Sequence, residues 1–394
     1  MDGKIYRKMI NVFIVGSKGI PAQYGGFETF VENLTKRKKS QTIHYFVSCM
    51  TNNADKVFEY NNATCFRIPV PKLGAFGRMV HVSISLHWVE KYIANNHNQC
   101  DTNIIYILGY RVGIFLRQHK KKFEKLGAVV VGNPDGLEWK RDKWNWFAKL
   151  ILCTFEKNMI KQCDYIICDS KAILEYIVQK YPTHNEDRYQ YIPYGSDIKL
   201  STSATEELNN FLINHSITNN GFYLVVGRFV PENNFEIIIR EFLLSKTNRD
   251  LLIITNVQAN SFYKKLCRKL NFENDSRIKF VGTLYNDQLL RKIRENCFAY
   301  IHGHSVGGTN PSLLEALAST ERNYLFDVKF NKEVALDTAL YFDSSRGSLS
   351  KLIDIEESNN RTPLSQTSRI QNLVNRFSWE KVILSYENFF MGIE

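Results

Sequence analysis

The sequence predicts an α/β protein with two domains in tandem, each containing a parallel sheet that is wound by helices on both faces. Short apolar runs alternate with amphipathic segments along most of the chain, which is typical of βαβ units. This alternation breaks once, near residues 193–216, and then starts again. The length of 394 residues also exceeds the roughly 250 at which single cores stop growing. These observations together predict two doubly wound domains.

The first series of elements begins with Ile10–Val15, an apolar run that predicts a buried strand. Phe27, Phe30, Val31 and Leu34 then repeat at i, i+3, i+4 and i+7, which predicts one face of a helix. We expect further strands and helices at Ile43–Val47, around Val80–Ala94, and at Asn103–Ile107, Ala128–Val131, Trp146–Ile160 and Tyr165–Cys168.

The second series follows the turn cluster Pro193–Asp197 and a polar stretch, which we take as the domain boundary. The first domain is therefore expected over 1–197, the second over 198–376, and a terminal helix over 377–394. Strands alternate with helices at Tyr223–Val226, Phe235–Leu244, Leu251–Ile254, Asn260–Leu270, Ile278–Val281, Asp287–Asn296, Phe298–Ile301 and Pro311–Ala318.

Composition excludes several classes of protein. The chain is 44% hydrophobic and 23% charged, which excludes wholesale disorder. Its 51 Lys and Arg against 40 Asp and Glu give 51 − 40 = +11, which favours anionic partners. The eight cysteines form no C-x-x-C pair, so we expect reduced thiols and a cytoplasmic protein. The charged start does not have the pattern of a signal peptide, and no apolar run is long enough to span a membrane.

Two loops at strand ends are candidate anion sites. Residues 16–26 are rich in glycine and open a helix, so this loop predicts either an anion site or only a tight turn. Arg228 follows a strand and precedes a turn into a helix, where a guanidinium could pair with phosphate oxygens. The alternative is that Arg228 is an exposed surface residue without a ligand, which is the simpler interpretation of an isolated arginine.

The loop 302–310 carries the most informative pattern. Asn310 suits a helix N-cap and Pro311 the first helical position, so a helix should begin here behind flexible glycines. Glu315 lies about one turn into that helix, where its carboxylate could accept hydrogen bonds from sugar hydroxyls. The alternative is a capping box between Ser312 and Glu315. The spacing of that box does not fit if Asn310 is the N-cap. His302 and the nearby His304 lack a clear third metal ligand, so we expect no metal there.

A fourth motif follows a first-domain strand at residues 133–141. Asp135 and Glu138 are the acidic groups there that are best placed for proton handling, with a solvated Asp-Gly turn as the alternative. From Trp139 to Trp146 the chain mixes indoles with basic residues, a mixture that suits a membrane interface. Packing of the tryptophans against the next helix explains it equally well.

Taken together, these motifs resemble bacterial glycosyltransferases of the GT-B fold, in the large retaining family 4 and its rhamnosyltransferase branch. The resemblance covers nearly the whole chain and is carried by VGSKGIPAQYGGFETFVENL, NPDGLEWKRDKW, GRFVPENN and GGTNPSLLEA, with a closing RFSWEKVILSYENF. It implies two Rossmann-like domains facing across a cleft, with the terminal helix crossing back to the first domain.

The resemblance also implies roles for individual residues. Arg228, with Asn233, would hold the donor diphosphate, which the loop Gly308, Thr309 and Asn310 would bind from the other side. Glu315 would bind the ribose. Gly25 and Gly26 would approach the reacting centre from the first domain, and the acceptor side would include Tyr24, Asp135, Glu138 and Trp139. Arg228, Glu315 and Asp135 are then the expected catalytic residues.

The implied reaction is the transfer of L-rhamnose, with retention, from dTDP-rhamnose to a lipid-diphosphate-linked saccharide in polysaccharide synthesis. The expected partners are the donor, the lipid-linked acceptor and the inner face of the cytoplasmic membrane, contacted peripherally. No D-x-D motif is present, so no essential metal or cofactor is expected. Nucleic acid is not an expected partner, because the chain lacks a basic recognition helix.

Four residues mark departures from the family pattern. Asn233 and Asn234 stand where a lysine usually follows the arginine, Gly307 replaces the first glutamate of the pair that ends at Glu315, and Ser305 replaces a glutamate of the rhamnosyl branch. Two alternatives therefore remain open: the same fold with a UDP- or GDP-hexose donor, and a catalytically degenerate paralogue that binds nucleotide-sugars or scaffolds an assembly.

Overall fold

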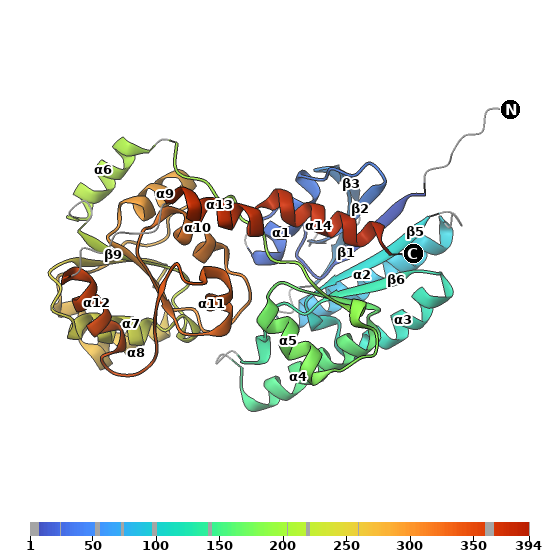
Figure 1. Ribbon diagram of the computed structural model, residues 1–394. Coiled ribbons are helices and arrows are strands. Elements are labelled where there is room, and N and C mark those ends of the chain that lie inside the picture. Colours follow the sequence, from blue (N-terminus) through green and yellow to red (C-terminus); the bar gives the residue numbers. More distant parts are fainter. Residues whose placement is uncertain are drawn as a thin grey trace. The chain divides into compact units, whose positions relative to one another are not determined.

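The computed structural model of the protein describes residues 8–23, 25–51, 56–71, 75–96, 101–140, 144–202, 204–217, 221–258, 260–358 and 366–393. The chain divides into two compact units. Residues Met1–Gly195 and Trp379–Glu394 form the first unit, and Ser196–Ser378 form the second (Figure 1). Each unit has its own sheet and its own hydrophobic cores.

The first unit contains an eight-stranded sheet in the order β3-β4-β2-β1-β5-β6-β7-β8. All neighbours are parallel except β3 and β4, which form an antiparallel pair at one edge. The strands are β1 (Ile10–Val15), β2 (Ile43–Thr51), β3 (Val57–Tyr60), β4 (Ala63–Pro69), β5 (Thr102–Leu108), β6 (Val129–Asn133), β7 (Tyr165–Cys168) and β8 (Tyr189–Tyr191).

Helices cover both faces of this sheet because its strands alternate their side chains between two cores. Phe13 of β1 joins the core with α2 to α5, whereas Val12 and Ile14 join the core with α1 and α14. The helices are α1 (Gly26–Lys36), α2 (Ala75–Asn95), α3 (Leu116–Lys125), α4 (Trp146–Gln162), α5 (Lys171–Lys180) and α14 (Trp379–Met391), with short 3-10 turns η1 (Tyr110–Phe115), η2 (Glu138–Lys140) and η3 (Glu186–Arg188).

The second unit contains a six-stranded sheet, entirely parallel, in the order β11-β10-β9-β12-β13-β14. If the six strands are numbered 1 to 6 along the chain, their order in the sheet is 3-2-1-4-5-6, which is the Rossmann arrangement. The strand order reverses between β9 and β12. The strands are β9 (Phe222–Val226), β10 (Asp250–Ile254), β11 (Ile278–Phe280), β12 (Ala299–His302), β13 (Asn323–Phe326) and β14 (Leu340–Phe342).

Both faces of the second sheet are also covered by helices. Tyr223 and Val225 of β9 pack with α7, α8 and α12, and Phe222 and Leu224 pack with α6 and α9 on the opposite face. The helices are α6 (Thr205–Asn214), α7 (Phe235–Leu244), α8 (Ser261–Leu270), α9 (Asp287–Asn296), α10 (Pro311–Ser319), α11 (Lys329–Ala335), α12 (Ser348–Ser358) and α13 (Gln366–Phe377), with 3-10 turns η4 (Pro231–Asn233) and η5 (Phe272–Asn274).

This architecture confirms the predicted fold class of two doubly wound α/β units. The elements that the sequence analysis did not name include β3, β4, β8, β13 and β14, which are short or carry polar residues inside the strand. α3 was also missed, because its basic residues conceal a face on which Leu116 and Phe123 are buried. Within the described part of the chain, no helix combines the length and apolarity required to cross a membrane.

A buried histidine makes the stability of the first unit depend on pH. His81 of α2 is 2% exposed, and its Nε2 atom lies 2.9 Å from Ser48 Oγ. Burial lowers the pKa of His81 from 6.5 to about 4. At pH values between about 4 and 6.5, the unfolded chain therefore binds a proton that the native state does not bind. The free energy of unfolding thus falls as the pH drops below 6.5.

Between pH 7 and pH 5 this one group is expected to remove about 2 kcal/mol from the free energy of unfolding. The measurement is urea unfolding of the wild type and of His81→Gln at both pH values. The variant should lose about that much of the pH dependence, whatever its stability at pH 7. An unchanged pH dependence would contradict the assignment.

Candidate functional site

The candidate site of the second unit lies where its strand order reverses. β9 and β12 are neighbours in the sheet, and the helices that follow them, α7 and α10, pack on opposite faces. The loops that leave the two carboxyl ends therefore diverge and leave a crevice, the usual ligand position in doubly wound sheets. Arg228 stands on the first of these loops, and residues 303–310 form the second.

Arg228 is presented to solvent by a tightly built turn. Its side chain is exposed, and among the described residues its guanidinium has no hydrogen-bond or ion-pair partner. Its backbone carbonyl accepts a 2.8 Å hydrogen bond from the side-chain amide of Asn233, which is 6% exposed. Asn233, expected to bind the donor, thus has its amide nitrogen occupied in shaping the loop beneath Arg228.

Several hydrogen bonds tie the two loops together. Asn234 adopts a left-handed conformation, with φ 53°, and donates from Nδ2 to Gly303 O at 2.8 Å. The backbone N–H and the hydroxyl of Ser305 both donate to Glu232 O, at 2.9 and 2.8 Å. Asn234 and Ser305, two of the departures noted in the sequence, therefore connect the two loops. This bracing makes the two loops one structural element.

Close backbone approach explains the glycine at 303. A Cβ atom on Gly303 would lie 2.2 Å from the backbone oxygen of Asn233, so only glycine fits without a shift of the loop. On either side of it, the His302 and His304 rings stack with centroids 4.2 Å apart. Burial, with His304 and Arg294 nearby, holds the pKa of His302 well below its usual value, so this ring is neutral. No group of three or more metal-ligating side chains occurs among the described residues.

The helix that follows is α10, and it begins as predicted. Asn310 is the N-cap, its side chain accepting from the backbone N–H of Ser312 at 2.9 Å, with Pro311 in the first turn. Gly307 adopts a φ of 143°, which an L side chain rarely allows, and Thr309 is 6% exposed. Pro311 has no N–H, and the backbone N–H groups of Leu313 and Leu314 bond to the carbonyl of Asn310. The N-terminus of α10 therefore directs the positive end of its dipole toward the loop.

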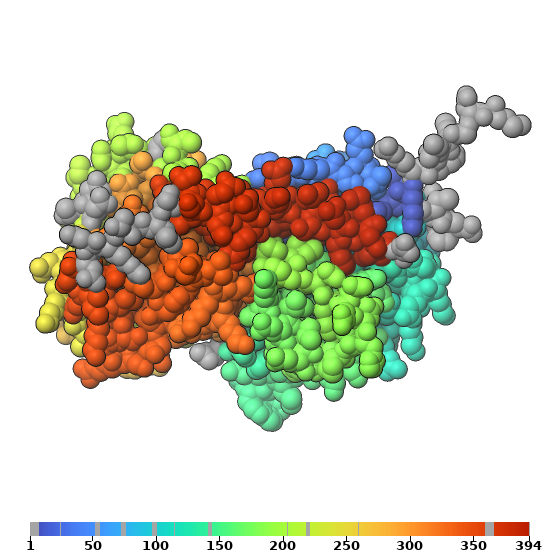
Figure 2. Space-filling model, in the orientation of Figure 1, coloured from blue at the N-terminus to red at the C-terminus, as the bar shows by residue number. Residues whose placement is uncertain are grey.

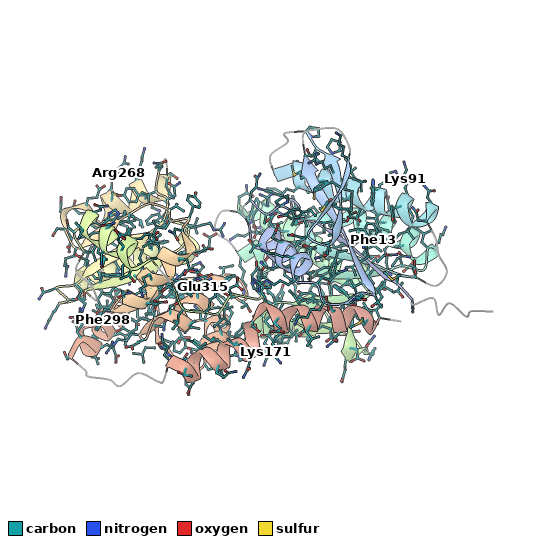
Figure 3. The ribbon with its side chains drawn as sticks, turned by 90° about the horizontal axis from the view of Figure 1, so that it is seen from above. Phe13, Lys91, Lys171, Arg268, Phe298 and Glu315 are labelled. Carbon is teal, nitrogen blue, oxygen red and sulfur yellow. The ribbon has the colours of Figure 1, made fainter. Side chains whose placement is uncertain are left out.

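Glu315 is held by an ion pair, not by the capping box that was the alternative. Its Oε2 lies 2.7 Å from Nη1 of Arg294 on α9. The Arg294 side chain is 2% exposed, the Glu315 side chain 28%, and Arg294 Nη2 also donates to Ser312 Oγ at 3.1 Å. Figure 3 labels Glu315 on α10. The pair orients a carboxylate that still reaches solvent.

Sequence reasoning missed Arg294, and the sequence contains no signal for it. An arginine in the last turn of an amphipathic helix reads as a solvent-facing residue that favours the helix dipole. Only the packing of α9 against α10 brings it to Glu315.

The first unit has a comparable reversal between β1 and β5, and the glycine-rich loop begins there. Gly16 has φ 105°, and a Cβ on it would lie 2.2 Å from Leu108 O at the end of β5. Two carboxylates of α1 hold this loop: Glu28 accepts from Lys18 N at 2.8 Å, and Glu32 accepts from Ala22 N at 3.0 Å. Neither was predicted from the sequence, because Glu28 in the first turn of α1 suits the helix dipole and Glu32 suits the solvent-facing side of an amphipathic helix.

The two glycines expected in the donor site stand at the start of α1. Gly25 is the N-cap with φ 134°, and a Cβ on it would collide with the Glu28 carboxylate. Gly26 has open space where a Cβ would project, and its carbonyl accepts from Tyr194 OH at 2.7 Å. Tyr24, expected on the acceptor side, lies outside the described residues.

The acidic motif follows β6 at the same end of the first sheet. Asn133 Oδ1 accepts from the N–H of Asp135, whose φ of 59° marks a tight turn. Glu138 is 8% exposed and accepts from Trp144 Nε1 at 3.2 Å. Trp139 donates from Nε1 to Glu156 of α4 at 2.9 Å. Glu138 and Trp139 thus have packing roles, whereas Asp135 is partly exposed at the turn.

The predicted residues therefore gather in two groups. Gly25, Gly26 and Asp135 stand at the carboxyl end of the first sheet, and Arg228, Glu315 and residues 308–310 stand at that of the second.

Two comparisons with known sequences found matches to this chain. Residues 9–197 match a family described as "Domain of unknown function (DUF1972)". The chain is also 23% identical over 389 residues to an uncharacterized glycosyltransferase, MJ1069, of Methanocaldococcus jannaschii. That match covers 93% of this chain and 94% of the relative.

Solved structures with similar folds cover almost the whole chain. Sucrose-phosphate synthase from Thermosynechococcus elongatus matches with a TM-score of 0.73 and 15% identity, over 98% of each chain. Anabaena Alr3699/HepE, in complex with UDP, matches with a TM-score of 0.69 and 13% identity, over 98% of this chain and 100% of that one. With its two parallel-sheet, Rossmann-like units, this chain has the fold of the GT-B glycosyltransferases.

Proposed function

We propose that the chain is a glycosyltransferase that moves a sugar from a nucleotide diphosphate donor to a saccharide acceptor. The observation that carries the proposal is that Arg228 and the N-terminus of α10 lie on neighbouring loops at the strand reversal of the second unit. The guanidinium of Arg228 has no partner among the residues that the structure describes. A guanidinium and a helix N-terminus on adjacent loops form a binding site for a diphosphate. MJ1069, named a glycosyltransferase, and HepE, solved with UDP, support this interpretation.

The chemistry follows from the charge that develops on the leaving group. Breaking the bond between the sugar and the diphosphate leaves negative charge on the diphosphate and an oxocarbenium-like sugar. Arg228 and the positive end of the α10 dipole would stabilise that negative charge in the transition state. Glu315, oriented by Arg294, would accept hydrogen bonds from the ribose hydroxyls. Asp135 would act from the acceptor side as the group that handles the acceptor proton.

The narrower proposal is the transfer of L-rhamnose from dTDP-rhamnose, with retention, to a lipid-diphosphate-linked saccharide at the cytoplasmic face of the membrane. Its support is the sequence resemblance carried by GGTNPSLLEA and the other three motifs. Ser305 and Gly307 occupy positions where relatives place carboxylates, and a deoxy sugar has fewer hydroxyls for such groups to bind. The same resemblance supports a reaction without an essential metal.

A thermal-shift panel tests the donor. We expect dTDP and dTDP-rhamnose, with EDTA present, to raise the melting temperature, while UDP, UDP-glucose, GDP and GDP-mannose do not. A ligand at 100 times its dissociation constant stabilises the native state by roughly 2.7 kcal/mol, which corresponds to a shift of several degrees. A shift with UDP or GDP compounds instead would keep the glycosyltransferase proposal and change the donor.

The loss of the first family glutamate favours one alternative, a degenerate paralogue that binds nucleotide-sugars without turnover. Gly307 has a backbone φ of 143°, so a glutamate there would be strained. Shifts in the panel without sugar transfer to any lipid-linked saccharide would support this alternative, and turnover that requires Arg228 would exclude it.

A further inference from the structure

The solvent face of α4 is divided into an apolar half and a basic half. In its first turns the exposed positions are Trp146, Phe147, Leu150 and Ile151, whose side chains are 68, 67, 56 and 50% exposed. Further along the same face, the exposed positions are Thr154, Lys157 and Lys161, at helical spacing. Large apolar side chains that are exposed together in this way mark an interaction site and not ordinary surface. In Figure 2 the first turns of α4, coloured teal, stand out at the lower edge of the first unit.

The basic half of this face opens into a pocket. Its volume is about 590 Å³, and its lining includes Lys157, Lys161, Lys180 and Arg188, together with Thr154 and Tyr181. Glu156, 1% exposed, pairs with Lys180 at 2.9 Å and accepts from Tyr181 OH at 2.9 Å. Arg188 donates to Cys163 O at 3.0 Å.

The charge of the pocket is only partly compensated. Glu156 neutralises Lys180, and Arg188 is fixed against the backbone at the end of α4. Lys157 and Lys161 have no ion-pair partner among the residues that the structure describes. The pocket therefore offers two unpaired ammonium groups above a rigid floor, a suitable arrangement for a phosphate.

The combination of these two halves identifies the occupant. An indole and a phenyl ring beside aliphatic side chains suit the boundary between headgroups and acyl chains, and lysines beside them suit anionic headgroups. A second copy of the chain is a poorer partner. A twofold contact through this face would place its unpaired lysines near their own counterparts, a like-charge contact that disfavours association.

We infer that the solvent face of α4 and the adjoining pocket form a binding surface for an anionic phospholipid bilayer. Trp146, Phe147, Leu150 and Ile151 enter the headgroup region, and Lys157 and Lys161 hold a lipid phosphate at the pocket. This gives the membrane contact of the proposed function a definite place on the chain. Bilayer binding is measured without donor or acceptor, so its failure would leave glycosyl transfer untouched, and the reverse also holds.

The test is co-sedimentation of the full chain with phosphatidylcholine vesicles, with and without phosphatidylglycerol. The wild type should partition onto the phosphatidylglycerol vesicles, and less so as salt rises, because each lysine near an anionic surface contributes to binding. The double variant Lys157→Glu/Lys161→Glu should weaken this partition by about tenfold or more. Trp146→Ser/Phe147→Ser should weaken it by about tenfold, because it removes the apolar contact.

Matched controls lie in the second unit. Lys264→Glu/Lys265→Glu, on the exposed face of α8, makes the same change in net charge. Ile213→Ser/Tyr285→Ser removes side chains that are 73 and 89% exposed. Both controls should change the partition by less than about twofold. All the substituted side chains are exposed, and circular dichroism checks that each variant is folded.

Three results would overturn the inference. The first is a wild type that shows no preference for phosphatidylglycerol vesicles. The second is a control pair that loses as much binding as its α4 counterpart. The third is a pocket that serves only soluble anions: inorganic phosphate would then raise the melting temperature in a way that depends on Lys157 and Lys161, while the vesicles bind nothing.

Discussion

Replacement of Arg228 by alanine is expected to lower kcat/KM for the nucleotide-sugar by about 10³-fold, the loss typical of removing a cation that stabilises a developing anion. The guanidinium is exposed and has no partner within the described chain, so its removal leaves no protein group unsatisfied. The melting temperature without ligand should therefore stay near that of the wild type. The measurements are steady-state kinetics with the donor that the thermal-shift panel identifies, and the melting temperature of each variant.

Two further substitutions sharpen this prediction. Arg228→Lys keeps the charge but loses the planar fork that binds two oxygens, and should recover part of the activity, to within an order of magnitude of the wild type. Arg268→Ala removes an exposed arginine of α8, labelled in Figure 3, and should change neither quantity. If Arg228→Ala and Arg268→Ala behaved alike, Arg228 would not be the diphosphate ligand.

Glu315→Ala is expected to have two separate effects. It leaves the guanidinium of Arg294, whose side chain is only 2% exposed, without its carboxylate partner, which should lower the free energy of unfolding by about 3 kcal/mol. It also removes the acceptor proposed for the ribose hydroxyls, which should lower kcat/KM by about 10²-fold. Urea unfolding measures the first effect, and steady-state kinetics at a temperature where the variant is folded measures the second.

The double variant Arg294→Met/Glu315→Met separates these two effects. Replacing both members of a buried ion pair by apolar side chains of similar size is often neutral for stability, so most of the lost stability should return. Activity should not return, because the carboxylate is still absent. A double variant that regains both stability and activity would show that Glu315 only maintains packing.

The parts of the fold that the sequence predicted are those set by local physics. Strands such as Ile10–Val15 are continuous apolar runs, and the start of α10 follows from the capping side chain of Asn310 and the fixed φ of Pro311. Edge and terminal strands such as β3 and β14 were not predicted, because they have three or four residues and contain polar or half-exposed positions. Their strand geometry depends on the neighbour with which they pair, and no local pattern encodes that neighbour.

The candidate site divides in the same way. Arg228 and Glu315 could be proposed from the sequence because each follows a strand end within a recognisable motif, and their roles stay predictions. Arg294, Glu28 and Glu32 were missed, because charged residues on amphipathic helices read as solvent-facing until packing gives them a partner. Asn233 was predicted to bind the donor, and this stays a prediction; its side-chain amide nitrogen donates to the carbonyl of Arg228.

The sequence by itself determined the alternation of strands and helices, the two-domain division and the loops that carry glycine, arginine and glutamate, because propensity, periodicity and capping act over a few residues. Only the tertiary structure decided which strands are neighbours, and so which loops share a crevice. It also decided that Arg294 meets Glu315, and that one face of α4 is left uncovered. These features arise from contacts between residues far apart in the chain, where partner choice depends on the packing of the whole unit.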